Sequence, residues 1–129
     1  MTTTNGVGSR PIRGHALVVE DDDLMRALLI EVLTDRGFRV SAFGNGAEAL
    51  AALGREGLED LKLAVIDIRL PGANGISVAH ALQISGWTGR LVMISAFADE
   101  HRRESVRALG ATLLDKPFKL SKLFAVIEA

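Results

Sequence analysis

An uninterrupted apolar run that ends at a carboxylate most restricts the fold of this chain. Leu63 to Ile66 are all apolar, and Asp67 follows at once. A strand with one face in water alternates polar and apolar residues, so this run predicts a strand buried on both faces, as in a parallel sheet. Pro71 and Gly75 bracket the loop that ends it. Ligand sites gather at such strand ends in open α/β sheets. Taken alone, however, Asp67 is also explained as a solvated strand end or a helix cap.

Similar strand-like runs recur along the chain and alternate with helical periodicity. The expected strands are residues 16–19, 38–43, 63–67, 91–94 and 111–115. Apolar residues at helical spacing predict helices at about 24–36, 46–56, 76–82, 99–109 and 121–128. The run 38–43 alternates only weakly, which indicates an outer strand, and Asn45 is a suitable cap for the helix after it. The pattern predicts an α/β fold: a doubly wound, five-stranded parallel sheet with helices on both faces.

The first expected helix carries a stripe of apolar residues that we expect to be buried. The stripe consists of Leu24, Met25, Leu28, Leu29, Val32 and Leu33, and Gly37 ends the helix. Ala27 and Ile30 fall outside the stripe and are expected to be exposed, where they are available to a docking face.

Composition limits the classes of function. The chain has 129 residues, enough for one domain with its own core, and its net charge of -1 gives no reason to expect nucleic acid or an anionic membrane as a partner. It has no Cys, so disulfides and thiolate metal sites are excluded and a cytoplasmic location is expected. Neither a membrane-spanning run nor a signal-peptide core is present. We expect residues 1–14 to form a flexible arm and residues 15–129 a single domain.

Four adjacent carboxylates, from Glu20 to Asp23, follow the first expected strand. Such carboxylates repel one another, so stability alone does not explain their placement. Asp22 or Asp23 can cap the helix that follows. Capping uses one or two side chains, and a divalent cation would relieve the repulsion among the rest.

Four of the five expected strands end in a polar or charged group. These groups are Glu20 with Asp21, Asp67, Ser95 and Lys116. Parallel strands end at the same edge of a sheet, so we expect the groups to converge. Carboxylate oxygens suit Mg²⁺, whereas the hydroxyl and the ammonium suit phosphoryl oxygens. An aspartate can accept a phosphoryl group as an acyl phosphate, a reaction that depends mainly on positioning and charge neutralisation.

In these motifs the sequence resembles the receiver domain of bacterial two-component response regulators, over about residues 15–128. The resemblance rests on the acidic pair Glu20-Asp21, on Asp67 with Pro71 and Gly75 after it, on Ser95-Ala96 and on Lys116-Pro117-Phe118. It implies a CheY-like, flavodoxin-like fold that takes a phosphoryl group from a sensor histidine kinase or a phosphotransfer protein. It also implies a signalling role in place of conventional enzyme activity, limited to self-phosphorylation and autodephosphorylation.

The resemblance also implies a role for each matching residue. Asp67 would be the phosphoacceptor, Ser95 would hydrogen-bond the phosphoryl group and Lys116 would pair with it. Mg²⁺ would be held directly by Asp21, Asp67 and the backbone carbonyl of Arg69, with Glu20 holding it through water.

Some positions depart from the family pattern. Ser95 and Glu20 replace the more frequent Thr and Asp, and both keep the functional group. Leu113 stands where the family usually has Tyr or Phe, so the usual inward swing of an aromatic ring on phosphorylation is not available to this chain. Arg69 and Phe97 occupy positions that flank the path of attacking water and influence the phosphoryl lifetime in the family.

Other functions are compatible with parts of this pattern. A receiver fold that acts as a scaffold without phosphorylation is one, and Leu113 favours it slightly. An aspartate-nucleophile phosphohydrolase would use Asp21 and Asp23, but the residue types and the cap domain expected with them are absent from the sequence. A flavin-binding protein would need a first loop that donates hydrogen bonds to phosphate, and this loop is acidic. Because the chain stops at its last helix, we expect output by contact with a downstream protein, although a piece of a longer regulator would look the same.

Overall fold

The computed structural model describes residues 13–96 and 98–128. Its strands are β1 (Gly14–Val19), β2 (Phe38–Phe43), β3 (Leu61–Asp67), β4 (Arg90–Ser95) and β5 (Thr112–Asp115). Its helices are α1 (Asp23–Asp35), α2 (Gly46–Glu56), α3 (Gly75–Ile84), α4 (Glu100–Ala108) and α5 (Leu120–Glu128). Strands and helices alternate throughout, as the sequence predicts.

The strands form one parallel sheet in the order β2-β1-β3-β4-β5. The predicted fold class is confirmed, and β2 lies at an edge of the sheet as expected. The strand order reverses direction between β1 and β3, which is the switch point where sheets of this topology form ligand sites. The carboxyl ends of these two strands carry Glu20, Asp21 and Asp67.

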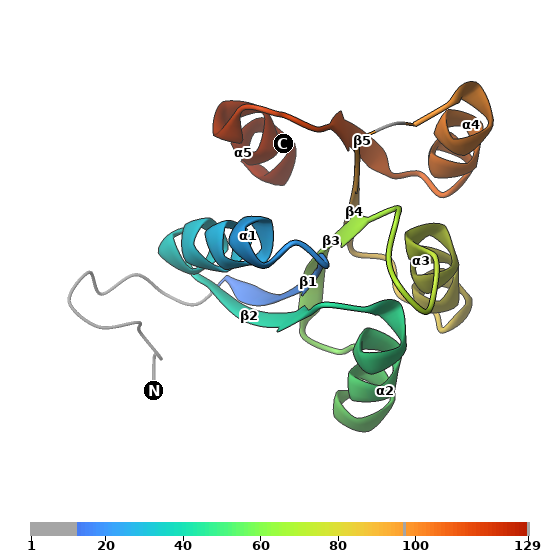
Figure 1. Cartoon of the computed structure of the whole chain (residues 1–129). Helices are drawn as coiled ribbons and strands as arrows, with labels where there is room; N and C mark the ends of the chain where they lie inside the picture. The colour runs from blue at the N-terminus through green and yellow to red at the C-terminus, as the bar shows by residue number, and fades with distance from the viewer. Residues whose placement is uncertain (1–12, 97, 129) are drawn as a thin grey trace, which may run out of the picture.

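The central strands are buried on both faces because each face is covered by helices. Helices α1 and α5 cover one face, and α2, α3 and α4 cover the other (Figure 1). Along β3, Leu63 and Val65 pack with the α1 and α5 side, whereas Ala64 and Ile66 pack with the opposite side. This alternation explains why the run in β3 is continuously apolar. It also fixes the backbone that carries Asp67.

Helix α1 differs in part from the predicted stripe. Leu29 and Leu33 are fully buried, but Leu24 is 85% exposed and Leu28 is 38% exposed, so the expectation for these two residues was wrong. Neighbouring residues on a helix differ by about 100° in direction. When Leu29 faces the sheet, Leu28 therefore lies beside the buried ridge. Ala27 and Ile30 are exposed, as predicted.

The start of the described chain is more ordered than the predicted arm. Gly14 belongs to β1, and the Arg13 backbone N–H donates to the Gly37 carbonyl at 2.7 Å. The Arg13 guanidinium also pairs with Glu128 at 2.8 Å and lies over the Phe38 ring. Gly14 thus begins β1, whereas the flexible arm expected at residues 1–14 stays a prediction, because residues 1–12 lie outside the described part of the chain.

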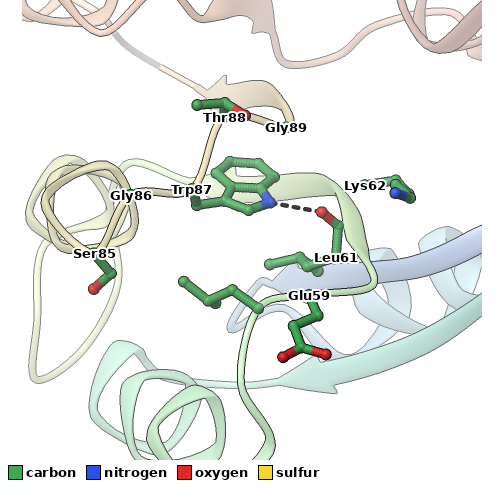
Figure 2. Close-up of a pocket in the computed structure, with 9 residues that line it drawn as sticks. Glu59, Leu61, Lys62, Ser85, Gly86, Trp87, Thr88 and Gly89 are labelled. Carbon is green, nitrogen blue, oxygen red and sulfur yellow. Dashed lines mark hydrogen bonds between the residues drawn. The ribbon is translucent and has the colours of Figure 1, made fainter.

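At the amino-terminal edge of the sheet, the loop between α3 and β4 is held by Trp87. This ring is 7% exposed, and its Nε1–H donates to the Leu61 carbonyl at 2.6 Å (Figure 2). A shallow groove of about 620 Å³ runs beside it, and none of the predicted site residues lines the groove. Within the described ranges, no helix is long and apolar enough to cross a membrane.

Candidate functional site

The structure brings three of the predicted site residues into direct contact. Lys116 follows β5 and reaches back to the ends of β1 and β3, where its Nζ lies 2.7 Å from Oε1 of Glu20 and 3.0 Å from Oδ2 of Asp67. Glu20 is fully buried and Asp67 is 5% exposed. Groups that are 49 residues apart in the chain, such as Asp67 and Lys116, therefore meet because parallel strands end at one edge.

The acidic residues gather tightly enough to hold one cation. Ligand oxygens of Glu20, Asp21 and Asp67 all lie within 4.8 Å of one another. Oε1 of buried Glu20 lies 2.7 Å from Nζ of Lys116, and its Oε2 accepts the Asp22 backbone N–H at 3.0 Å. Hard carboxylate oxygens gathered this closely fit Mg²⁺.

Ser95 ends β4, next to the strand that carries Asp67. Its side chain is fully buried, and its Oγ has no hydrogen bond to the described residues. Buried hydroxyls nearly always have a partner, so this orphan is unusual in a core. The Ser95 carbonyl accepts the backbone N–H of Lys116 at 2.7 Å, which ties the ends of β4 and β5 together.

Burial and the shared ammonium set the electrostatics of the site. Burial raises the pKa of Glu20 to about 7, despite its hydrogen bonds to Lys116 and to the backbone N–H of Asp22. For Lys116, burial by itself lowers the pKa, but the hydrogen bonds to Glu20 and Asp67 outweigh it and the net shift is upward. Lys116 is therefore a stable cation, and the two carboxylates compete for it.

The backbone around Asp67 is fixed by the loop that follows it. Oδ1 of Asp67 accepts the Arg69 backbone N–H at 3.1 Å, and Gly75 N–H donates to the Ile68 carbonyl at 2.9 Å. Gly75 packs so closely that a Cβ at this position would collide with the Asp67 carbonyl oxygen. The sequence identified Gly75 as a loop boundary and as part of the motif that follows Asp67. Its role as a contact of the Asp67 backbone becomes visible only in three dimensions.

Arg26 is a residue of this site that sequence reasoning missed. From α1, its Nη1 donates to the Glu20 carbonyl at 2.9 Å and to the Asp21 carbonyl at 3.5 Å, and its Nη2 pairs with Asp23 at 2.6 Å. Its spacing of three residues from Asp23 on a helix was the available signal. Asp22, in turn, caps α1, as predicted for it or Asp23.

Two predicted positions are only partly described by the structure. The Arg69 side chain is exposed and borders a groove of about 440 Å³ with Asp21 and Arg102. The use of the Arg69 carbonyl as a metal ligand stays a prediction. Phe97 lies outside the described residues. Leu113, the non-aromatic residue of β5, is partly buried and packs against the core on the α2, α3 and α4 side.

Comparison with known proteins identifies the family. Residues 16–128 match the response regulator receiver domain. The chain belongs to this family. It is 34% identical over 113 residues to the transcriptional activator protein PfeR of Pseudomonas aeruginosa, a match that covers 88% of this chain and 36% of PfeR. The match spans less than half the length of these curated relatives.

Solved structures agree with this assignment. The receiver domain of HemR from Leptospira biflexa, in its non-phosphorylated form, is 28% identical with a TM-score of 0.78, covering 89% of this chain and 91% of that one. TrrA from Thermotoga maritima, solved in complex with Mg²⁺–BeF, is 26% identical with a TM-score of 0.75, covering 89% of this chain and 96% of that one.

Family membership makes this chain a receiver domain of two-component signalling, which is a signalling domain and not a classical enzyme. Some of its relatives are named as transcriptional regulators. The expectation of no nucleic-acid partner, drawn from net charge, is therefore not confirmed and stays a prediction.

Proposed function

We propose that this receiver accepts a phosphoryl group on Asp67 with Mg²⁺ and passes the signal on by protein contact. The observation that carries the proposal is the contact of Lys116 with both buried carboxylates, Glu20 and Asp67, at 2.7 Å and 3.0 Å. A lysine in this place neutralises charge at the acceptor through Oδ2, whereas the second oxygen, Oδ1, accepts the Arg69 backbone N–H.

The proposed reaction is a transfer from phosphohistidine to aspartate. A carboxylate oxygen of Asp67 forms a bond with phosphorus while the phosphorus–nitrogen bond of the donor breaks, and the leaving imidazole takes up a proton. Lys116 would move from the Asp67 carboxylate to a phosphoryl oxygen, and the Ser95 Oγ, which has no hydrogen bond among residues 13–96 and 98–128, would donate to another. Lys116 is already 3.0 Å from Asp67, and Ser95 ends the strand beside β3, so we expect little reorganisation.

Glu20, Asp21, Asp67 and the Arg69 carbonyl would hold Mg²⁺. The ion would neutralise phosphoryl charge that Lys116 alone cannot balance. Its fit is supported by the spacing of the three carboxylates, whose ligand oxygens lie within 4.8 Å of one another.

The partners follow from the same proposal. The donor would be a sensor histidine kinase or a phosphotransfer protein, the recipient of the signal a downstream protein, and the place of action the cytoplasm. The TrrA complex with Mg²⁺–BeF supports the chemistry by analogy only, because it describes that protein.

The test is phosphorylation by a small donor, read by intact-protein mass. With acetyl phosphate and Mg²⁺ the chain should gain one phosphoryl mass, and Asp67→Asn should abolish the gain. Asp60→Asn is the matched control, because Asp60 precedes β3 and is exposed at the opposite edge of the sheet. Labelling of Asp67→Asn at the normal yield would assign the acceptor elsewhere.

The same experiment separates the alternatives. A phosphorylation-independent scaffold, the function that Leu113 favours, would gain no mass with any donor. A phosphohydrolase would turn over phosphate esters in excess of the protein concentration. An acceptor that labels once and then loses the group slowly is what we expect.

A further inference from the structure

Arg26 links α1 to the acidic loop by contacts to both backbone and side chain. One nitrogen, Nη1, donates to the carbonyls of Glu20 and Asp21 at 2.9 Å and 3.5 Å. The other, Nη2, pairs with Asp23 at 2.6 Å. The Arg26 side chain is 25% exposed, so this is not a freely solvated surface pair. We propose that Arg26 is a positioning residue that holds the acidic loop in the form that binds Mg²⁺, an inference that rests on the proposed function.

The backbone contacts determine where the carboxylates point. Glu20 and Asp21 leave β1 at a sharp change of direction, and the Glu20 N–H is fixed to the Phe43 carbonyl at 3.0 Å. Arg26 donates to the carbonyls of Glu20 and Asp21, so the loop backbone is held at these carbonyls as well as at the Glu20 N–H. Without Arg26, like-charge repulsion would favour a wider loop and separate the three ligand oxygens. Their 4.8 Å grouping therefore depends on a group outside the ligand set.

The positive charge of Arg26 and its contacts with the acidic loop have opposite effects on Mg²⁺ binding. A free guanidinium beside a divalent cation would repel it, so its removal would strengthen binding. Asp23 neutralises much of the Arg26 charge through the 2.6 Å pair. Solvent also screens the ion pair of Arg26 with the exposed Asp23 carboxylate. The contacts of Arg26 with the two carbonyls lie nearer the buried Glu20. We therefore expect positioning to dominate, and loss of Arg26 to weaken Mg²⁺ binding.

The test is the Mg²⁺ concentration that half-saturates the full chain, measured by calorimetric titration of Mg²⁺ into the protein. Arg26→Lys keeps the charge but cannot reach two carbonyls and Asp23 together, and Arg26→Gln removes the charge. We expect both variants to raise the half-saturating Mg²⁺ concentration by roughly five- to tenfold, the ratio for about one lost hydrogen bond.

Arg36→Gln is the matched control. Arg36 also belongs to the α1 region, but it lies over the Phe124 ring and pairs with Glu128, away from the acidic loop. This variant should lower thermal stability without changing Mg²⁺ binding. If Arg26→Gln fails to fold, which loss of Trp87 burial would report by fluorescence, Arg26→Lys decides the question.

The outcomes separate the inference from the proposed function. Unchanged Mg²⁺ binding in Arg26→Lys, or tighter binding in Arg26→Gln, overturns the positioning role while the proposed function stands. If the unmodified chain binds no Mg²⁺ and gains no phosphoryl mass, the proposed function itself fails.

Discussion

At the scale of single residues, the site depends on one close backbone approach. Gly75 opens α3 and lies against the carbonyl of Asp67, where a Cβ would collide with that oxygen and approach the Ile68 backbone. Backbone atoms cannot move aside as a flexible side chain can. The strand end and the helix start are thus fitted to each other by the absence of a side chain.

We predict that Gly75→Ala destabilises the protein by about 2 kcal/mol or more, because overpacking forces the backbone apart. It should also lower the phosphorylation yield at Asp67. Gly54→Ala is the control: nothing lies within 4 Å of a Cβ there, and its φ is not in the left-handed region. In the interior of α2, that change should stabilise by about 0.5–1 kcal/mol. Denaturant unfolding followed by Trp87 fluorescence measures the free energy of unfolding of both variants. Equal changes in this free energy for the two substitutions would contradict the close-approach argument.

Residue-scale prediction from the sequence worked where strand ends carry the chemistry. Glu20, Asp67 and Lys116 could be placed together because a buried run locates each strand end and parallel strands share an edge. The contacts of Arg26 and Gly75 could not be placed in this way. They depend on the exact separation of α1 and α3 from the strand ends, which hydrophobic periodicity does not contain.

At the scale of elements, α4 is the helix least anchored in the core. Val106 is its one buried residue, whereas α2 and α3 each bury four. It also has polar ties: Arg103 pairs with Asp115 of β5 at 2.9 Å, and Gln83 donates to the carbonyl of Leu109, the residue after the helix, at 2.6 Å. Elements with few buried apolar contacts open at low free energy. Helix α4 also follows β4, whose last residue is Ser95.

We predict that α4 and the loop before it report occupancy of the acceptor. When Ser95 is drawn toward a phosphoryl group, segment 96–109 should change its amide exchange, because it follows Ser95 directly and its helix α4 buries Val106 alone. Leu113 should change little, since it has no ring to move and stays packed on the core. Exchange with and without Mg²⁺ and beryllofluoride measures this.

Changes confined to Leu113 and β5, with a silent segment 96–109, would contradict the α4 prediction. If the mimic binds and neither region responds, the scaffold function becomes the better proposal. Arg103→Gln offers a control, because removal of the Asp115 pair should loosen α4 before any ligand is added.

Element positions were well predicted, but the orientation of α1 was not. Six apolar residues on that helix spread over more of its circumference than one buried face, and Leu24 and Leu28 lie outside. Periodicity finds the stripe; the angle at which a helix packs on the sheet decides which edge of the stripe is covered. Leu24 and Leu28 are thus exposed on the helix that follows the acidic loop, and packing in the core does not account for them.

At the scale of the whole molecule, the strand order was the part that sequence could not supply. Alternating strands and helices predict a doubly wound sheet, yet several orders satisfy short right-handed crossovers. The observed order puts β1 and β3 side by side and so brings two acidic strand ends together. The whole fold thereby holds repelling carboxylates at one edge, at a cost in stability that depends on protonation.

That cost predicts how global stability varies with pH. Burial raises the pKa of Glu20 to about 7 from the ordinary 4.5, so between these values the folded state keeps a proton that the unfolded state has lost. The stabilisation is complete below pH 4.5 and is lost as the pH rises through 7. Buried His15 acts with the opposite sign, since burial lowers its pKa and folding is penalised as the pH falls below about 6.5.

Glu20→Gln isolates the carboxylate because His15 is the same in both proteins. Without Mg²⁺, the difference in melting temperature between Glu20→Gln and the unmodified chain should shift by several degrees in favour of Glu20→Gln as the pH rises from 4.5 to 7.5. Saturating Mg²⁺ should close this gap, because the cation favours ionised Glu20 in the folded state and the amide replaces it poorly. Thermal unfolding in steps of pH, with and without Mg²⁺, measures the gap. A gap that is constant across the pH range would mean that Glu20 is ionised as readily in the folded protein as in the unfolded chain, and that its burial at the strand edge carries no such cost.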